Sequence, residues 1–377
     1  MKVDFYKHPL TEKNFSSYKK IFKSDIITSG PVGDRVEKKL AKYLNVKNVI
    51  LTSSWTTGAL ITLLALKLKK NDEVIIPSMT FSATANVLEI LGVKPIFVDV
   101  EKDTLLANYN EILKKINKKT KAIMPVHLYG NMFDTEKLNK FIKKNKLDIH
   151  IIEDSAHSLE SSLRGFKSGK WSSAAIFSFY ATKNITCGEG GAIATNNNDL
   201  AKKLRKLKSF GLSQTAVEKY NSKKYTEVDM YDLGINAKLP DLLSHMLLSQ
   251  IKDIKKNLSK RKKIYRRYLN LLKKTDVTIP KIPKNCESAF HLFVIGVDKR
   301  KRSEIINFFK KKQIGCSVHY KPLHKLTYYK KKYKLNDKNL LNSTSWGQEC
   351  ITLPFHLKIT PKQQFFVIKT LKQVLIK

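Results

Sequence analysis

Lys183 stands in a short polar turn between two apolar segments that are typical of buried strands. Residues 174–179 (Ala-Ala-Ile-Phe-Ser-Phe) precede the turn, and residues 192–195 (Ala-Ile-Ala-Thr) follow it. A Gly-Glu-Gly-Gly tract, residues 188–191, lies before the second segment and can adopt positive φ angles in a sharp turn. A lysine amine held at the mouth of two strands can act as a nucleophile toward a carbonyl group. This stretch alone leaves open the alternative of an ordinary loop lysine between hairpin strands.

Three further groups of different chemistry follow other predicted strands. Asp154 ends one strand and offers a carboxylate, although an isolated Asp more often caps a turn. Thr56 and Thr57 lie where a strand runs into a helix, and the free N–H groups and dipole of a helix N-terminus favour a phosphate. Phe81 follows a third strand and offers an aromatic ring, which by itself would more often be a core residue.

A repeated alternation of strands and helices positions these residues. Strands are expected at residues 48–52, 73–77, 95–100, 121–126, 149–153, 174–179 and 192–195, and helices at 33–44, 56–68, 83–91, 109–116, 134–144 and 200–208. This order predicts an α/β fold with a seven-stranded, mostly parallel sheet and helices on both faces. Ligands of such sheets bind outside the carboxyl ends of the strands, where all four groups are expected.

The remainder of the chain predicts a second, smaller unit. A polar connection spans residues 214–232, and a mainly helical segment spans residues 239–272. Beyond it, strands are expected at residues 289–297, 315–320 and 350–353 and helices at 303–312 and 361–375. We therefore expect a large α/β domain over residues 1–245, with an N-terminal arm, and a small α+β domain over residues 246–377.

The four groups at one sheet edge match the requirements of pyridoxal phosphate. The amine of Lys183 can form a Schiff base with that cofactor. The carboxylate of Asp154 can keep the pyridine nitrogen protonated, so that the ring withdraws electrons. A helix N-terminus can hold the phosphate, and an aromatic side chain can stack on the ring.

Several motifs, in this order along the chain, make a resemblance specific. From about Gly30 to the C-terminus, the chain resembles the DegT/DnrJ-type nucleotide-sugar aminotransferases, which have pyridoxal-phosphate fold type I. Residues 184–191 are particularly similar to enzymes that form 4-amino-4-deoxyarabinose and to related C4 aminotransferases. The motifs are Pro77-Ser-Met-Thr-Phe81, Pro125-Val-His-Leu-Tyr-Gly130, Glu153-Asp-Ser-Ala-His157, Phe177-Ser-Phe-Tyr-Ala-Thr-Lys183-Asn184, Gly234-Ile-Asn-Ala-Lys-Leu239 and His319-Tyr-Lys-Pro-Leu-His324.

The resemblance implies roles for individual residues around the cofactor. Lys183 would carry pyridoxal 5'-phosphate and later move a proton, while Asp154 would pair with the pyridine nitrogen. His157 would lie near the ring hydroxyl, and Phe81 would stack on the ring. The phosphate would be bound by three hydroxyl-bearing residues, which are Thr56, Thr57 and Ser178.

The resemblance also implies a homodimer with shared active sites. Asn236 would reach the cofactor phosphate of the partner subunit, whereas a turn-forming Asn is the alternative. His319, Tyr320 and His324 would belong to a loop near the sugar nucleotide. No metal is expected, because His319 and His324 lack the i, i+4 spacing of a helical pair and no acidic residue completes a site.

The implied activity is the transfer of an amino group from an amino acid, glutamate in the family, to a nucleotide-linked keto-deoxysugar for surface polysaccharide or lipopolysaccharide biosynthesis. A dehydratase on the same scaffold is the nearest alternative, but relatives of that kind replace the lysine with His, and this chain keeps Lys183. A catalytically idle sensor with the same fold is a further alternative. A basic nucleic-acid-binding regulator would be a different class, supported by charge alone.

Composition places the chain among globular proteins with an unusual charge. Its 377 residues carry a formal net charge of +39, from 71 Lys+Arg against 32 Asp+Glu. The lysines are spread over the whole chain without a basic stripe, so dedicated nucleic-acid binding is not expected. Four scattered cysteines, no signal-like N-terminus and no long apolar run favour a cytoplasmic protein without membrane segments.

Three residues depart from the family pattern. Trp55 stands where relatives usually have Gly or Ala, so the indole is expected either to point outward or to contact the substrate. Phe210 occupies a position where many relatives have His, and Ser155 replaces a common Ala. These departures leave open what the three side chains do.

Overall fold

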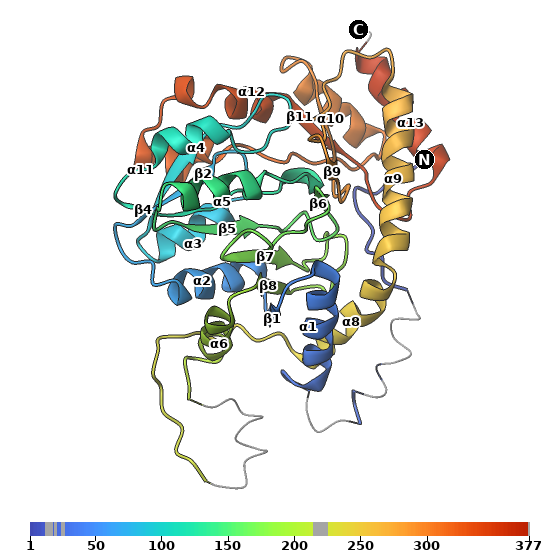
Figure 1. Ribbon diagram of the computed structural model, residues 1–377. Helices are drawn as coiled ribbons and strands as arrows, with labels where there is room; N and C mark the ends of the chain where they lie inside the picture. Colours follow the sequence, from blue (N-terminus) through green and yellow to red (C-terminus); the bar gives the residue numbers. More distant parts are fainter. Residues whose placement is uncertain (12–17, 19–20, 24–26, 214–224, 376–377) are drawn as a thin grey trace.

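A seven-stranded sheet lies at the centre of the large unit (Figure 1). The computed structural model describes residues 1–11, 18, 21–23, 27–213 and 225–375. In spatial order the strands are β1, β8, β7, β5, β4, β2 and β3. Their bounds are β1 Asn48–Thr52, β2 Glu73–Pro77, β3 Lys94–Val98, β4 Thr120–Ile123, β5 His150–Asp154, β7 Ala174–Ser178 and β8 Gly191–Thr195.

The directions of the strands confirm the mostly parallel sheet. Parallel pairing joins β3 to β2, β2 to β4, β4 to β5 and β5 to β7. Strand β8 runs antiparallel to both of its neighbours, β7 and β1, so β8 alone is reversed within this sheet. The carboxyl ends of the other strands therefore lie at one edge, where a ligand site is expected.

Helices cover both faces of the sheet, because alternate side chains of each strand point to opposite sides. In β1, Ile50 packs with α2 and α6, while Val49 and Leu51 pack with α1 and α8. In the same way, the outer strands pack against α3 on one face and against α4 and α5 on the other. The helices are α1 Pro31–Leu44, α2 Trp55–Ala65, α3 Ala83–Ile90, α4 Tyr109–Lys115, α5 Thr135–Lys144, α6 Asn198–Leu207 and α8 Asp241–Lys252.

The C-terminal part forms a smaller α+β unit around the antiparallel pair β10 (Phe293–Gly296) and β11 (Cys350–Leu353). Its core is built on side chains of α9, α10 and α13, and Val3 of the N-terminal arm joins that core. Residue 245, the predicted domain boundary, lies inside α8, and the division at that residue stays a prediction. The remaining elements are α9 Ile254–Leu272, α10 Arg302–Lys311, α11 Thr327–Tyr333, α12 Leu341–Glu349, α13 Pro361–Leu375, β6 Ser162–Leu163, β9 Cys286–Glu287 and the short 3-10 helices Leu128–Gly130, Leu323–Lys325 and Asp337–Asn339.

Two expectations about this unit differ from the structure. The strand predicted at residues 315–320 does not form, because its backbone makes a single bridge, from Ser317 to Thr352. Val3 forms a bridge with Ile314, which directly precedes these residues. Helices α11 and α12 were not predicted, since their sequences show no clear apolar period. Residues 214–224 of the predicted polar connection lie outside the described residues. No helix in the described part of the chain is long and apolar enough to cross a membrane.

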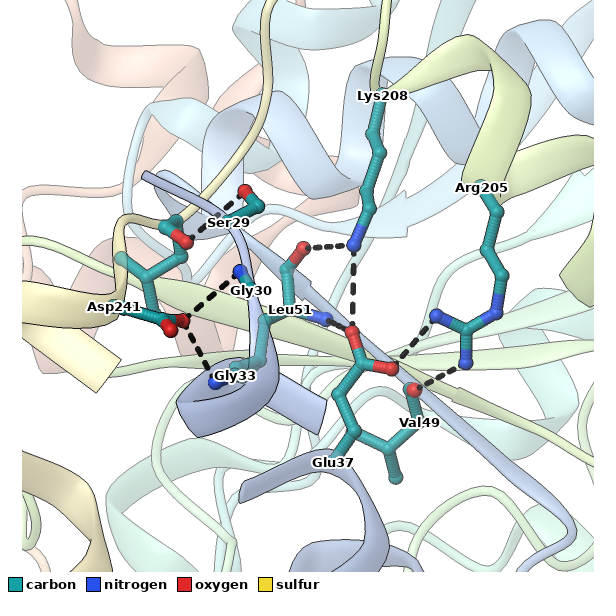
Figure 2. A network of polar contacts seen from close by, with 10 residues as sticks. Ser29, Gly30, Gly33, Glu37, Val49, Leu51, Arg205, Lys208 and Asp241 are labelled. Atoms are coloured by element: carbon teal, nitrogen blue, oxygen red, sulfur yellow. Dashed lines mark hydrogen bonds and ion pairs between the residues drawn. The ribbon is translucent and has the colours of Figure 1, made fainter. Parts of the chain in front are cut away.

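Two buried carboxylates join α1 to the rest of the large unit (Figure 2). Asp241 accepts hydrogen bonds from the backbone N–H groups of Gly30 (3.0 Å) and Gly33 (2.8 Å), which α1 cannot satisfy itself. Glu37 accepts from the N–H of Leu51 at 2.9 Å and forms an ion pair with Arg205 at 2.7 Å. Since α1 lies directly over β1, these contacts fix the edge of the sheet from which the α2 N-terminus extends.

Replacement of Glu37 with Gln is expected to destabilise the fold. The variant removes the charge that faces Arg205, whose side chain is 42% exposed. Loss of one partner of a fully buried pair costs about 3–5 kcal/mol, so we expect about 2 kcal/mol for this partly solvated pair. Urea unfolding measures the difference in the free energy of unfolding. The exposed Glu304→Gln on α10 is the control, and an equal change in both variants would contradict this role for Glu37.

Candidate active site

A cavity of about 520 Å³ opens at the carboxyl ends of the parallel strands. It is lined by segments that directly follow β1, β2, β5 and β7, and by parts of the small unit and the N-terminal arm. The predicted residues among its lining are Thr56, Phe81, Asp154, His157, Ser178, Lys183, His319 and Tyr320. The structure thus brings together, at one edge, side chains from distant parts of the sequence.

Asp154 is the last residue of β5, and its carboxylate is buried in the wall of this cavity. Burial raises the pKa of Asp154, while a hydrogen bond from Thr84 opposes that shift. The Thr84 hydroxyl donates to Oδ2 at 2.9 Å, and the N–H of Ala156 donates to Oδ1 at 3.2 Å. These two donors fix the orientation of the carboxylate from α3 and from the loop after β5.

Lys183 lies in the turn after β7, where its backbone N–H donates to the carbonyl of Tyr180 at 2.9 Å. Burial lowers the pKa of the Lys183 amine to about 8, and attraction to Asp154 partly opposes this shift. Within the described part of the chain, the amine forms no ion pair that would hold it in the charged form. A substantial fraction of the amine is therefore neutral near pH 8 and able to attack a carbonyl carbon.

The turn that carries Lys183 is held in place by its neighbours in the sequence. The side-chain amide of Asn184 donates to Glu160 (3.0 Å) and to the carbonyl of Ala289 (3.0 Å), and its oxygen lies 3.0 Å from Nδ1 of His291. On the other side of the turn, the Tyr6 hydroxyl donates to the carbonyl of Ala181. The lysine backbone is thus fixed by groups from the large unit, the small unit and the N-terminal arm.

His157 is buried against the cavity as a neutral imidazole. Burial, followed by the nearby Lys183 amine, holds the pKa of His157 well below its usual range. Its Nδ1 accepts from the N–H of Tyr129 at 3.3 Å, so the proton must lie on Nε2. Nε2 then donates to the hydroxyl of Tyr320, which lies 3.2 Å away. This arrangement gives His157 a fixed tautomer and connects it to the loop of the small unit.

The turn before α2 contributes hydrogen-bond donors to the cavity. Of the two threonines predicted to bind the phosphate, only one lines the cavity. The Thr57 hydroxyl is engaged in a reciprocal capping box with Ser54, at 3.1 Å in both directions, and Thr57 does not line the cavity. Thr56 does line it. The backbone N–H groups of Trp55 and Thr56 belong to the first turn of α2, which has no internal acceptors for them. Such a helix start can bind a phosphate.

The glycines after Lys183 are needed mainly because other parts of the chain pack directly against their backbone, and less because of positive φ angles. Only Gly188 of this tract has a positive φ, at 85°. A Cβ on Gly191 would lie 2.5 Å from the carbonyl carbon of Ser54, and a Cβ on Gly190 would lie 2.5 Å from Sγ of Cys187. Any larger residue at position 191 would therefore push β8 away from the turn that begins α2.

The outer wall of the cavity is aromatic. Phe81, whose side chain is 58% exposed, lies 5.9 Å from the ring of Tyr320, measured between ring centroids. His319 stacks on Phe5 of the N-terminal arm at 6.0 Å. Nothing in the sequence around residue 5 indicates a role in a site, so the N-terminal wall could be identified only in the structure.

Two predicted site residues lie elsewhere. His324 is 1% exposed and does not line the cavity, because the 3-10 helix Leu323–Lys325 turns its ring inward between Ser78 (2.6 Å) and Thr344 (2.9 Å). Asn236 is exposed on the surface and is not among the residues that line the cavity of its own subunit. This position leaves both predictions for Asn236 open, a role at the partner's site and a turn-forming role.

The departures from the family pattern also have definite positions. Trp55 does not point outward: it is 6% exposed and belongs to the same buried cluster as Ala59 and Leu63. The residue also lines the cavity, so contact with the substrate stays a prediction. Phe210 is 46% exposed and has a positive φ of 63°. Ser155 is buried, and its hydroxyl has no hydrogen-bond partner among the described residues.

Sequence reasoning missed several residues of this site. Thr84, which holds Asp154, lies one helical turn after Thr80, and the two hydroxyls are 3.0 Å apart. That i, i+4 pair of threonines at the start of a helix was a usable signal. Tyr6 had none, because it reaches the site from a remote part of the chain. Tyr129 lies in the motif at residues 125–130, but no role was assigned to it from the sequence.

The residues present fit pyridoxal phosphate. A partly neutral amine, a buried carboxylate, an unfilled helix start and an aromatic wall surround one cavity of suitable size. When bound there, the cofactor supplies a carbonyl group and an electron-withdrawing ring. Among the described residues, no group of three or more His, Cys, Asp and Glu side chains could hold a metal ion.

The titration of Lys183 in the cofactor-free protein is a direct test of this environment. We expect its acylation, followed by mass spectrometry across a pH series, to have a midpoint at about 8, below the ordinary lysine value of 10.5. Asp154→Asn removes the attraction that raises this pKa, so its midpoint should lie below that of the unaltered protein. A midpoint near 10.5 would show that the amine is solvated.

Comparison with known proteins gives a consistent result. The model of the DegT/DnrJ/EryC1/StrS aminotransferase family matches residues 9–372. Protein MJ1066 of Methanocaldococcus jannaschii, which is uncharacterised, is 34% identical over 357 residues, 93% of this chain and 92% of that protein.

Solved structures agree with the sequence comparison. Spr1654 from Streptococcus pneumoniae in its PLP form is 27% identical, with a TM-score of 0.92 over 100% of this chain and 99% of that chain. PseC of Helicobacter pylori, an aminotransferase involved in the biosynthesis of pseudoaminic acid, is 26% identical, with a TM-score of 0.90 over 100% of both chains. With its fold of type I and pyridoxal 5'-phosphate as the cofactor, this chain belongs to the DegT/DnrJ/EryC1/StrS aminotransferase family.

Proposed function

We propose that this protein transfers an amino group from an amino acid, glutamate in the first instance, to a nucleotide-linked keto-deoxysugar. The observation that carries the proposal is the partly neutral amine of Lys183, which faces the buried Asp154 in a cavity with an open aromatic wall. Family membership supports amino transfer, and the resemblance around residues 184–191 favours C4 of a 4-keto-6-deoxyhexose. The product would serve surface polysaccharide or lipopolysaccharide synthesis in the cytoplasm.

Lys183 is the proposed catalytic residue because a single group must both bind covalently and move a proton. With a pKa of about 8, its amine can release a proton or accept one near neutral pH. With pyridoxal phosphate held in this cavity, Lys183 would bind it covalently and would also be the group that moves a proton at the reacting carbon of the substrate. The ties at Asn184 and Tyr6 hold its backbone still while the side chain moves.

The other proposed roles follow from the positions of the lining residues. Asp154 would pair with the pyridine nitrogen, and His157 would lie beside the ring hydroxyl. Phe81 would stack on the ring, while Thr56 and Ser178 would bind the phosphate. Thr57 would support phosphate binding indirectly: its hydroxyl is hydrogen-bonded to Ser54 and holds the turn at the start of α2.

The loop with His319 and Tyr320 is the proposed contact for the sugar nucleotide. Both side chains line the cavity, and Tyr320 is bonded to His157 at 3.2 Å. Burial lowers the pKa of His319 to about 4, so this side chain is neutral at physiological pH. A neutral imidazole and a phenol can donate hydrogen bonds to sugar hydroxyls without attracting the acidic donor substrate.

A shared active site in a homodimer is also proposed. Asn236 is exposed, and the segment before it, residues 225–235, carries several large exposed apolar side chains. In Figure 1, this yellow-green stretch leaves the body of the protein beside α6. Exposed apolar clusters of this kind are typical of protein–protein contacts. These side chains are Tyr225, Met230, Tyr231 and Leu233, with exposures of 88%, 58%, 66% and 75%.

The activity is tested by incubating the purified protein and pyridoxal phosphate with glutamate and either 4-keto or 3-keto nucleotide sugars. We expect amination at C4, with Lys183→Ala about 10³-fold slower because the proton-transfer group is lost. The exposed Lys362→Ala should retain full activity. Amination at C3 alone would contradict the ring position, and loss of a sugar hydroxyl without amination would indicate the dehydratase.

The shared site is tested by mixing two variants that are each inactive, Lys183→Ala and Asn236→Ala. In a mixed dimer, one site carries both changes, while the other has its own Lys183 and the intact Asn236 of its partner. Activity should therefore return after subunit exchange, at one of the two sites of each mixed dimer. If verified mixed dimers stay inactive, Asn236 acts within its own subunit.

A further inference from the structure

A second cavity, of about 540 Å³, lies in the small unit and has a strongly basic lining. It is formed where the start of α10, the end of α12, α11 and the segment 321–325 meet. No acidic residue and no aromatic residue belongs to its lining. Its cations are Lys299, Arg302, Lys321, Lys325 and Lys330.

The charges of this cavity are mostly uncompensated. Lys325 pairs with Asp337, but the other four cations have no carboxylate within ion-pair distance in the described part of the chain. Asp337 also attracts Lys330, while Asp298 holds Arg300 at 2.7 Å and Glu89 holds Lys332 of α11. Converging cations in a concave surface repel one another, and an anion between them would relieve this repulsion.

The donors of the cavity suit phosphate groups. Arg302 donates through Nε to the carbonyl of Cys350 at 3.0 Å, which leaves its two terminal nitrogens available. A guanidinium fork binds two oxygens of one phosphate, and flexible lysines around it can neutralise a second phosphate. Because several cations converge, a multiply charged anion is favoured over a single carboxylate.

We propose that this cavity binds a small polyphosphate anion, either inorganic pyrophosphate or the diphosphate of a nucleotide. The lining offers no aromatic face on which a base could stack, so the phosphates would supply the binding energy. This site is separate from the active cavity, and the proposal does not depend on the reaction catalysed there.

The two cavities share one loop. His319 and Tyr320 line the active cavity, while the next two residues, Lys321 and Pro322, line the basic one. Gly347 lets α12 approach this loop closely, since a Cβ there would lie 2.3 Å from Cδ of Pro322. Backbone packing therefore holds α12 against the loop at residues 321–322, which fixes the wall from which Lys321 extends.

The test uses the protein saturated with pyridoxal phosphate, so that the phosphate site of the active cavity is filled. Calorimetric titration at fixed ionic strength compares inorganic pyrophosphate with uridine diphosphate. Lys299→Gln/Lys321→Gln removes two exposed cations of the cavity, and Lys362→Gln/Lys369→Gln removes two exposed cations of α13. We expect at least about tenfold weaker binding in the first variant and less than about twofold change in the second.

Hydrogen exchange locates the bound anion. Protection of residues 299–302 and 321–330 on addition of pyrophosphate supports the proposal, whereas protection confined to the Lys183 peptide overturns it. An equal loss of affinity in both double variants would also overturn it, since that would reflect the net charge of +39 and no defined site. Binding of uridine diphosphate that is tighter than that of pyrophosphate, and that weakens at least about tenfold in Lys299→Gln/Lys321→Gln, would identify a nucleotide as the source, whereas equal or weaker binding would identify inorganic phosphates.

Discussion

Removal of the Lys183 amine from water is the interaction that determines the chemistry of the active cavity. In water, a lysine amine is almost fully protonated near neutral pH and is therefore a poor nucleophile. Burial lowers the pKa of Lys183 to about 8, so that part of the amine is neutral. Asp154 opposes this shift without forming an ion pair, and a closer carboxylate would have kept the amine charged. The neutral His157 has the same origin, because burial and the adjacent amine both disfavour an imidazolium.

Such a site requires rigid surroundings, since a solvated loop would let water restore the charge. The sheet provides them, because the reversed β8 begins at the edge at which β1 and β7 end: Gly191 pairs with both Thr52 and Ser178. Gly191 then lies against the carbonyl carbon of Ser54, so that the lysine turn and the start of α2 form one packed surface. Glu37 ties α1 to β1 through Leu51, and Asp241 binds the N–H groups at the start of α1 (Figure 2).

The sequence predicted what depends on local pattern and left out what depends on remote contact. Strand β2 was predicted to the residue, because its apolar run ends at a proline and neighbouring turn residues. Lys183, Asp154 and Thr56 were predicted together because strand ends of a parallel sheet meet at one edge. Tyr6 could not be predicted, since its hydroxyl bonds a carbonyl 175 residues away and no local signal marks that contact.

The orientation of His324 likewise depends on remote contacts. From the sequence alone, a His in the motif at residues 319–324 can face either a cavity or the core. In the structure, the 3-10 helix Leu323–Lys325 directs the ring of His324 to the hydroxyls of Ser78 and Thr344. The lysines make the point most generally. This chain carries a large surplus of them, yet their chemistry is set by position: solvated on a helix, paired with a carboxylate, gathered around a concave surface, or buried as a nucleophile. Net charge alone therefore indicates little about function, and the burial and partners of each amine indicate much more.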